Sequence, residues 1–142
     1  MTISAILGRK GDQVVSVECG TTVREAVAKL TAHRIGALPV TRDGKAVGIL
    51  SERDIIYCLD SEGASILDRP VDKVMTAPAI SVETDVPVLS ALSQMSARRI
   101  RHLPVVEGER LIGIVSIGDL VAYRIARIEE EAEAMRGYIQ GT

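Results

Sequence analysis

Two Ser-x-x-Asp pairs are the part of this sequence whose residue types and spacing best suit ligand chemistry. The pairs are Ser51 with Asp54 and Ser116 with Asp119. A carboxylate offers two acceptor oxygens, which match the two hydroxyls of a ribose diol. The same spacing forms a capping box at a helix start, in which the serine caps the helix and the aspartate bonds back to it. Both roles can hold at once, because a residue in the first helical turn lies at the edge of a cleft.

Basic side chains near these pairs could bind the phosphates of such a ligand. An arginine makes forked contacts with phosphate oxygens, and a histidine is a donor that strengthens as the pH falls. Arg101 and His102 are candidates for this role, although each could equally be a solvated charge at a strand end. Arg53 could contact a phosphate or pair with its neighbour Glu52.

Nothing in the sequence supports catalysis. The only histidines are His33 and His102, so a cluster of His with Asp or Glu at metal-ligand spacing cannot be assembled. The phosphate-binding patterns GxGxxG and GxxxxGK[ST] are absent. A triad of Ser116, His102 and Asp119 would not explain why the serine and aspartate recur in a repeat without an equivalent histidine. We therefore expect no enzyme activity, no metal and no catalytic cofactor.

The chain repeats itself at a fixed offset of 65 residues. Residues 16–54 align without a gap to residues 81–119, with 15 identities in 39 positions. Chance does not keep one register over such a length, so the chain is a duplicated unit.

Each repeat has the pattern of a β-α-β-β-α unit, which predicts the α/β class. Short stretches at 14–17 and 79–82 predict opening strands, and Val23, Ala26 and Leu30 show the spacing of a helix. Ser51 and Ser116 predict the starts of the closing helices. Hairpins formed by short buried strands are expected in between, at 37–41 with 46–50 and at 102–106 with 111–115.

The two repeats share a motif at corresponding places. Residues 33–40 with 48–54, and 99–105 with 113–119, combine Leu-Pro-Val in a strand with Gly-Ile-x-Ser-x-x-Asp at the closing helix. This arrangement resembles the cystathionine-β-synthase-type (CBS) domain. The chain is identified as a tandem CBS pair, or Bateman module, of the stand-alone bacterial type. The resemblance implies two repeats packed sheet to sheet with pseudo-twofold symmetry. The expected boundaries are 7–60 and 75–125 for the repeats, 61–74 for a linker, and 126–142 for a C-terminal helical extension.

The resemblance also implies a function. CBS pairs hold adenosine compounds such as AMP, ADP, ATP, NAD(H) or S-adenosylmethionine in two clefts between the repeats. They usually regulate an enzyme, channel or transporter, and here the target would lie on a separate, unidentified protein. The ligand-binding positions carried over to this chain are Lys10, Val15, Gly36, Ala37, Ser51, Arg53, Asp54, Ile80, Arg101, His102, Ser116 and Asp119.

The resemblance implies that different carried-over residues contact different parts of the ligand. Val15 and Ile80 would contact the adenine, although plain core packing explains either residue on sequence grounds alone. Gly36 and Ala37 would leave room for the base to approach the backbone. Lys10 would line a cleft, or be an ordinary surface lysine.

The two clefts are expected to differ in strength. Only the second repeat carries Arg101 and His102, although Arg101 lies near the pseudo-twofold axis and could reach either cleft. In the family's geometry the cleft of Asp119 also draws on the opening strand of the first repeat, with Lys10 and Val15. We therefore expect that cleft to bind a phosphorylated ligand more tightly than the cleft of Asp54 does.

The C-terminal segment carries an apolar stripe. Its members recur at steps of four and three residues, and they are Val121, Ile125, Ile128, Ala132, Met135 and Ile139. The stripe is short for a free coiled coil, so we expect it to pack on its own module or on a partner subunit. A homodimer is predicted. The alternative function is a ligand-independent interaction or scaffold module, in which the stripe carries the function.

Composition excludes other classes of function. The formal net charge is −2, and aromatic residues make up 2% of the chain. Neither a clustered basic surface nor aromatic stacking platforms for nucleic acid are therefore expected. No apolar run approaches the roughly 20 residues that span a bilayer, so we expect no membrane association and a cytoplasmic location.

Overall fold

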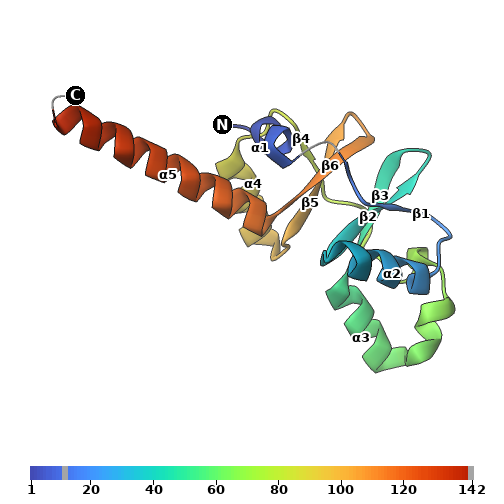
Figure 1. Ribbon diagram of the computed structural model, residues 1–142. Coiled ribbons are helices and arrows are strands. Elements are labelled where there is room, and N and C mark those ends of the chain that lie inside the picture. Colours follow the sequence, from blue (N-terminus) through green and yellow to red (C-terminus); the bar gives the residue numbers. More distant parts are fainter. Residues whose placement is uncertain (11–12, 141–142) are drawn as a thin grey trace.

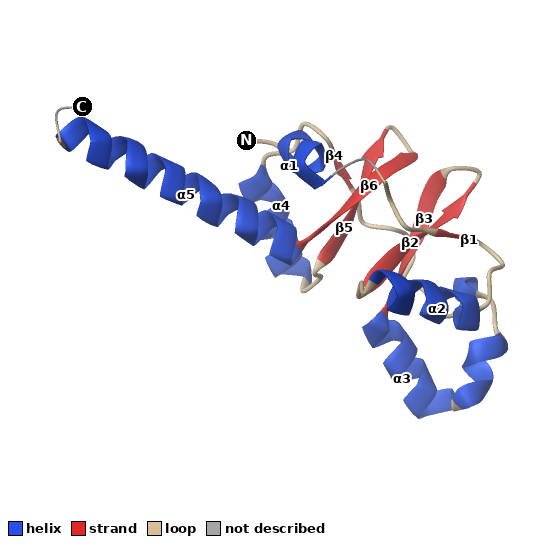
Figure 2. Cartoon of the chain, in the orientation of Figure 1, coloured by secondary structure: helices blue, strands red, loops and turns tan. Residues whose placement is uncertain are grey.

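The computed structural model describes residues 1–10 and 13–140. Figure 1 shows two halves side by side, and Figure 2 shows that each half combines short strands with helices. In chain order the elements are α1 (Ile3–Lys10), β1 (Val17–Glu18), α2 (Val23–His33), β2 (Ala37–Arg42), β3 (Lys45–Ser51), α3 (Glu52–Glu62), the 3-10 helices η1 (Ala64–Asp68) and η2 (Val71–Lys73), β4 (Val82–Glu83), α4 (Val88–Arg98), β5 (His102–Glu107), β6 (Arg110–Ser116) and α5 (Ile117–Ile139).

The two halves share the same strand pairing at the offset of 65 residues. Val17 pairs with Val40 in the first half, and Val82 pairs with Val105 in the second. The β2–β3 and β5–β6 hairpins have equivalent antiparallel registers, each with an irregularity at the same position. The predicted pair of β-α-β-β-α units is confirmed.

The halves meet in the middle of the strand order. Within the described residues the strands run β1-β2-β3-β6-β5-β4, and β3 pairs with β6 through Lys45 and Arg110. In addition, β2 contacts β6 and β3 contacts β5. Read inwards from its two ends, this order gives β1, β2, β3 on one side and the equivalent strands β4, β5, β6 on the other. This agrees with an approximate twofold axis between the halves.

The opening strands are shorter than predicted, because the parallel pairing ends beside a proline. The Cys19 amide donates to the Thr41 carbonyl, so Thr41 is a residue of β2 whose backbone faces β1. Backbone groups alternate sides along a strand, so the next donor facing β1 would be the amide of Pro39. Proline has no N–H, and the pairing therefore does not extend back to Val15. The second half repeats this arrangement with Pro104.

Helix α1 is absent from the predicted elements, and it packs into the core of the second half. Its Ile3 and Ile6 are buried there among side chains from α4, β5 and β6. In the first half, the fully buried Ile66 and Val71 from η1 and η2 occupy the core instead. The segment predicted as a linker, 61–74, therefore supplies core residues.

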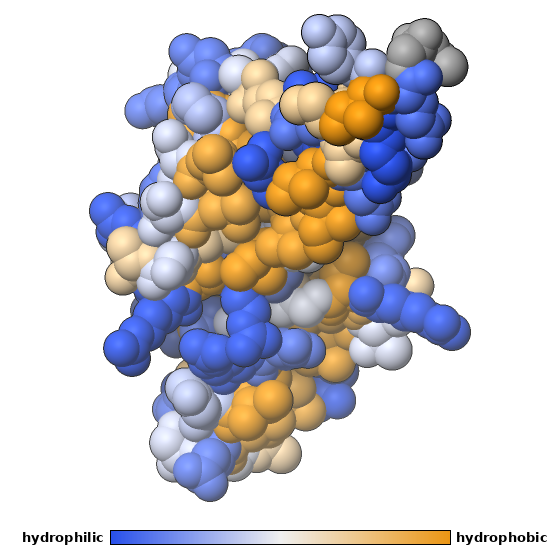
Figure 3. All heavy atoms as spheres, turned by 90° about the vertical axis from the view of Figure 1, so that its left-hand side faces the viewer, coloured by the Kyte–Doolittle hydropathy of each residue, from blue (hydrophilic) through white to orange (hydrophobic). Residues whose placement is uncertain are grey.

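Helix α5 projects well beyond the second half (Figure 1). Its predicted apolar stripe is exposed, from 43% at Val121 to 74% at Ile139. Figure 3 shows hydrophobic side chains gathered in a band on the side of the molecule from which this helix projects. The expectation that the stripe packs on its own module is therefore wrong, and docking on a partner stays a prediction.

Candidate functional site

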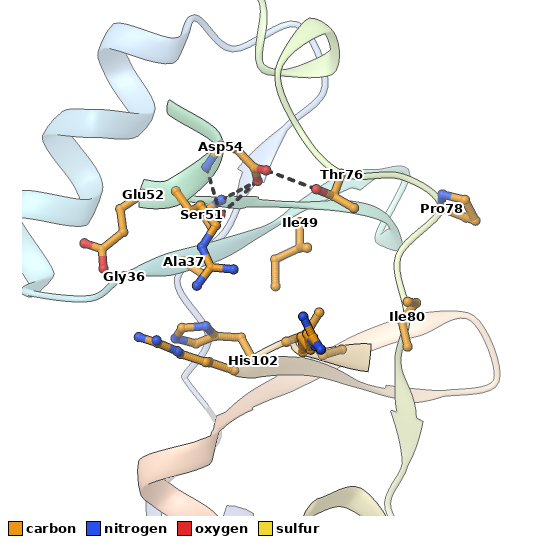
Figure 4. Close-up of a pocket in the computed structure, with 14 residues that line it drawn as sticks. Gly36, Ala37, Ile49, Ser51, Glu52, Asp54, Thr76, Pro78, Ile80 and His102 are labelled. Atoms are coloured by element: carbon orange, nitrogen blue, oxygen red, sulfur yellow. Dashed lines mark hydrogen bonds between the residues drawn. The ribbon is translucent and has the colours of Figure 1, made fainter. Parts of the chain in front are cut away.

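A cleft opens between the two halves beside the start of α3 (Figure 4). The space that it encloses together with the open solvent at its mouth is about 870 Å³. It is termed the Asp54 cleft. Eight of the residues predicted to bind the ligand line it, namely Gly36, Ala37, Ser51, Arg53, Asp54, Ile80, Arg101 and His102.

The carboxylate of Asp54 is fixed in the first turn of α3. Its Oδ2 accepts hydrogen bonds from the backbone N–H and the hydroxyl of Ser51, both at 3.0 Å, and Ser51 Oγ accepts the Asp54 N–H at 3.2 Å. This is the predicted capping box. The other oxygen of the carboxylate, Asp54 Oδ1, accepts a hydrogen bond from Thr76 Oγ1 at 3.1 Å (Figure 4). Because a carboxylate oxygen has two lone pairs, Oδ1 keeps acceptor capacity for a ligand hydroxyl.

Three arginines bring positive charge to the same cleft. Arg53 comes from the first turn of α3, Arg99 caps the end of α4, and Arg101 directly precedes β5. Among the described residues, none of the ion pairs within 4.0 Å involves any of the three, so the alternative pairing of Arg53 with Glu52 is not formed. Unpaired guanidinium groups on one cleft are suited to forked, charge-assisted binding of phosphate.

His102 lies across the Asp54 cleft from the aspartate, on the wall formed by the second half (Figure 4). Burial lowers the pKa of His102, and the charge on Lys10 lowers it further. The carboxylates of Asp119 and Glu52 oppose this effect without cancelling it. At neutral pH the imidazole is therefore largely uncharged and can gain a proton when an anion binds beside it.

Lys10, Ser116 and Asp119 come together at the equivalent place in the second half. Lys10 Nζ donates to Asp119 Oδ2 at 2.7 Å and to the Ile114 carbonyl at 2.9 Å. The Ser116 N–H donates to the same Asp119 oxygen at 2.8 Å within a second capping box. Burial raises the pKa of Asp119, but the hydrogen bonds from Lys10 and Ser116 and the lysine charge outweigh burial and lower it overall.

The structure places Arg101 and His102 on the Asp54 cleft, although the sequence predicted them beside Asp119. His102 is also near enough to Lys10 and Asp119 for their charges to act on its pKa. The first half has Gly36 and Ala37 at the corresponding positions. A Cβ on Gly36 would lie 3.8 Å from His102 Cε1, an ordinary van der Waals distance, so the imidazole lies against the first half.

Sequence reasoning missed six residues that line the Asp54 cleft. The missed residues are Ile49, Glu52, Thr76, Pro78, Arg99 and Ile100. Two signals were available, because Arg99-Ile100 repeats Arg34-Ile35 and the Met-Thr-Ala-Pro segment at 75–78 leads into the second repeat. Val15, which was predicted beside Asp119, packs against the core of the first half, and its contact with a ligand stays a prediction.

Neither a metal site nor a membrane-spanning helix is found in the described part of the chain. No group of three or more His, Cys, Asp or Glu side chains there is placed to hold a metal ion. None of the helices in residues 1–10 and 13–140 has the length and apolar character needed to cross a membrane.

Sequence comparison finds one family twice in this chain. The family model for the CBS domain matches residues 9–61 and 71–126. The mitochondrial CBS domain-containing protein CBSX3 of Arabidopsis thaliana is 36% identical, over 99% of this chain and 72% of that protein. The CBS domain-containing protein YhcV of Bacillus subtilis is 31% identical, over 87% of this chain and 88% of that protein.

Solved structures show the same architecture. The CBS-domain protein ATU1752 from Agrobacterium tumefaciens superposes with a TM-score of 0.82 at 38% identity, covering 87% of this chain and 99% of that one. The CBS domain pair of MJ0100, solved with 5′-methylthioadenosine and S-adenosylmethionine, has a TM-score of 0.79 at 26% identity and covers 89% and 98% of the two chains. With its repeated fold and its cleft between the halves, this chain belongs to the CBS domain family as a tandem CBS pair.

Proposed function

We propose that this CBS pair is a regulatory module that binds an adenine nucleotide, such as AMP, ADP, ATP or NAD(H), in the Asp54 cleft. It acts on a separate partner protein, in the cytoplasm, and catalyses no reaction itself. The observation that carries the proposal is the convergence of three unpaired arginines and the Asp54 carboxylate on one cleft. Anion-binding groups beside a diol-binding group match the two polar ends of a nucleotide.

The lining residues divide the ligand into three parts. The ribose diol binds at Asp54, where Oδ1 keeps acceptor capacity. The apolar side chains of Ile80 and Ile100 pack against adenine beside Ala37, whose small side chain leaves room for a flat base. The phosphates bind the three arginines, which come from both halves of the chain.

The charge of the cleft favours a phosphorylated ligand over S-adenosylmethionine. The sulfonium group of S-adenosylmethionine is a cation, and three unpaired arginines repel it. The MJ0100 pair, solved with two adenosine compounds, supports adenosine recognition as the feature shared with this chain. The arginines then determine which adenosine compound is preferred.

Signal transfer follows from the position of the cleft between the halves. Side chains from β2, β3 and the start of α3 in the first half line it, together with Ile80 and residues 99–102 of the second half. A ligand that fits one relative pose better than another shifts the population towards that pose by its difference in affinity. A partner protein that contacts both halves would detect this shift.

The first test is a thermal melt of the purified protein with AMP, ATP, NADH or S-adenosylmethionine. A ligand that binds only the native state stabilises it by about 2.7 kcal/mol when present at 100 times its Kd. We expect the phosphorylated compounds to raise the Tm by several degrees and S-adenosylmethionine to raise it less. A panel in which no compound raises the Tm would contradict nucleotide binding.

The affinity for ADP is expected to increase as the pH falls from about 7.5 to about 5.5. The low pKa of His102 keeps it neutral in the free protein, and phosphate binding favours its protonation. The control is His102→Gln, which cannot titrate, so the difference between the two proteins removes the protonation of ADP itself from the comparison. Parallel profiles for both proteins in calorimetry would refute this role.

The lowered pKa of His102 makes the free protein less stable as the pH falls, whereas its affinity for ADP rises. Since the folded-state pKa of His102 is lowered, the unfolded chain takes up this proton first. The stabilisation from neutral His102 is present above the ordinary histidine pKa and is lost as the pH falls through the lowered value.

We further propose that the chain forms a homodimer through the exposed stripe of α5. Exposed apolar patches of this kind mark association sites. Light scattering at high micromolar concentration is expected to give twice the chain mass, and Ile125→Glu is expected to reduce it towards the monomer. Glu131→Gln on the same helix is the control and should leave the mass unchanged. A monomer mass for the unaltered protein would refute the dimer.

The exposed stripe also favours a second candidate function, a ligand-independent interaction or scaffold module. In that case the two aspartates serve only as helix caps, a role that both already fulfil. A protein that assembles through α5 and shows no Tm response to any nucleotide would have this function.

A further inference from the structure

The side chain of Lys10 lies on Asp119, at the place in the second half that corresponds to the Asp54 cleft. It comes from the last residue of α1, and its ammonium group contacts both Asp119 Oδ2 and the Ile114 carbonyl. The exposed fractions of the Lys10 and Asp119 side chains are 37% and 30%, so the ion pair is partly shielded from water. A ribose diol approaching Asp119 would meet a cation already bound there.

In the Asp54 cleft, Thr76 contacts the corresponding residues. Its backbone exchanges two hydrogen bonds with Ile49, at 2.9 and 3.0 Å, and its hydroxyl donates to Asp54 Oδ1. Ile49 and Asp54 are the counterparts of Ile114 and Asp119 at the offset of 65 residues. The Lys10 ammonium therefore donates to the counterparts of both residues, but on Asp119 it binds Oδ2, the oxygen that also accepts the Ser116 N–H.

The segments that carry Thr76 and Lys10 also match in their packing. A Cβ on Gly48 would lie 2.6 Å from Met75 Sδ, and a Cβ on Gly113 would lie 2.8 Å from Leu7 Cδ2. Each segment thus packs onto an equivalent glycine, and a side chain at either position would require Met75 or Leu7 to shift. Lys10 is consequently held at this position by the packing of α1, not by its charge alone.

The two contacts differ in their chemistry. The Thr76 hydroxyl is neutral, so it leaves the negative charge of Asp54 in place for a ligand. The Lys10 ammonium compensates the charge of Asp119 through a short, charge-assisted hydrogen bond. In addition, the second half has Gly118 at the position of Arg53, so it lacks that phosphate-binding group.

We propose that Lys10 is a built-in occupant of the Asp119 cleft, so that the protein binds one nucleotide per chain and binds it in the Asp54 cleft. This inference rests on the proposed nucleotide binding and adds the residue that selects between two otherwise equivalent sites. Removal of the ammonium group opens the second site.

Calorimetry with AMP on the unaltered protein and four variants tests the inference. We expect one site per chain in the unaltered protein, the same site weakened roughly ten- to a hundredfold in Asp54→Ala, two sites in Lys10→Met, and one site of unweakened affinity in the Lys10→Met/Asp54→Ala double variant. Arg9→Met, which removes the neighbouring charge of α1, is the control and should keep one site. A melting curve of each variant shows that it is folded.

The outcomes separate this inference from the proposed function. One site in both the unaltered protein and Lys10→Met would overturn the role of Lys10 and leave nucleotide binding intact. Two sites in the unaltered protein, or tight binding at Asp119 that Lys10→Met abolishes, would show that Lys10 contacts the ligand and would also overturn it. Absence of AMP binding in every protein would overturn the proposed function together with this inference.

Discussion

Replacing Ile3 with alanine is expected to lower the free energy of unfolding by about 2–5 kcal/mol. Ile3 is fully buried in the core of the second half, although it lies at the opposite end of the chain from much of that core. The substitution removes apolar contacts and leaves a cavity that the surrounding strands and α4 cannot fill. Urea unfolding, followed by circular dichroism, measures the loss through the shift of the midpoint.

Two further substitutions control for the position and for the half of the molecule. Ser4→Ala changes an exposed neighbour on the same helix and should alter the free energy by no more than about 0.5 kcal/mol. Ile66→Ala removes the equally buried isoleucine of η1 and should destabilise the first half as strongly as Ile3→Ala destabilises the second. An effect of Ile3→Ala as small as that of Ser4→Ala would show that α1 does not belong to the core.

The repeated elements were predictable because their apolar positions recur twice in one register. The same register places Val17 beside Val40 and Val82 beside Val105 in the structure. Helix α1 was not predictable in this way, because the corresponding place in the first half is taken by Met75 and Thr76, which follow η2 and are not helical. The two segments differ in conformation and in sequence, and they correspond only in their packing against Gly113 and Gly48 and in their hydrogen bonds to Asp119 and Asp54.

The sequence predicted which residues belong to the candidate site better than it predicted which cleft each of them lines. The capping boxes at Asp54 and Asp119 follow from local spacing alone, and both are present. Assignment to a cleft depends on the direction in which a side chain leaves the strands near the twofold axis. Arg101 and His102 line the Asp54 cleft, and the 65-residue offset between the repeats carries no information on the direction of their side chains.

Asp54→Ala is expected to weaken AMP binding by roughly ten- to a hundredfold, which corresponds to the loss of a charge-assisted contact worth about 1.5–3 kcal/mol. The Asp54 carboxylate keeps acceptor capacity on Oδ1 for a ribose hydroxyl, beside the hydrogen bond from Thr76. Arg101→Ala should cause a loss of similar size, because it removes a guanidinium that has no ion-pair partner among the described residues. Calorimetry at fixed pH and salt measures both effects.

Asp119→Ala is the matched control for Asp54→Ala. It removes the same capping interaction from the other half, so both variants should lose a similar amount of stability, about 0.5–2 kcal/mol. A general effect of destabilisation on binding would therefore appear equally in the two variants, whereas loss of the ribose contact appears only in Asp54→Ala. If Asp119→Ala weakens AMP binding and Asp54→Ala does not, the nucleotide binds in the other cleft. If none of Asp54→Ala, Asp119→Ala and Arg101→Ala affects AMP binding, the two aspartates are helix caps only. The interaction surface on α5 is then the better explanation of what this CBS pair does.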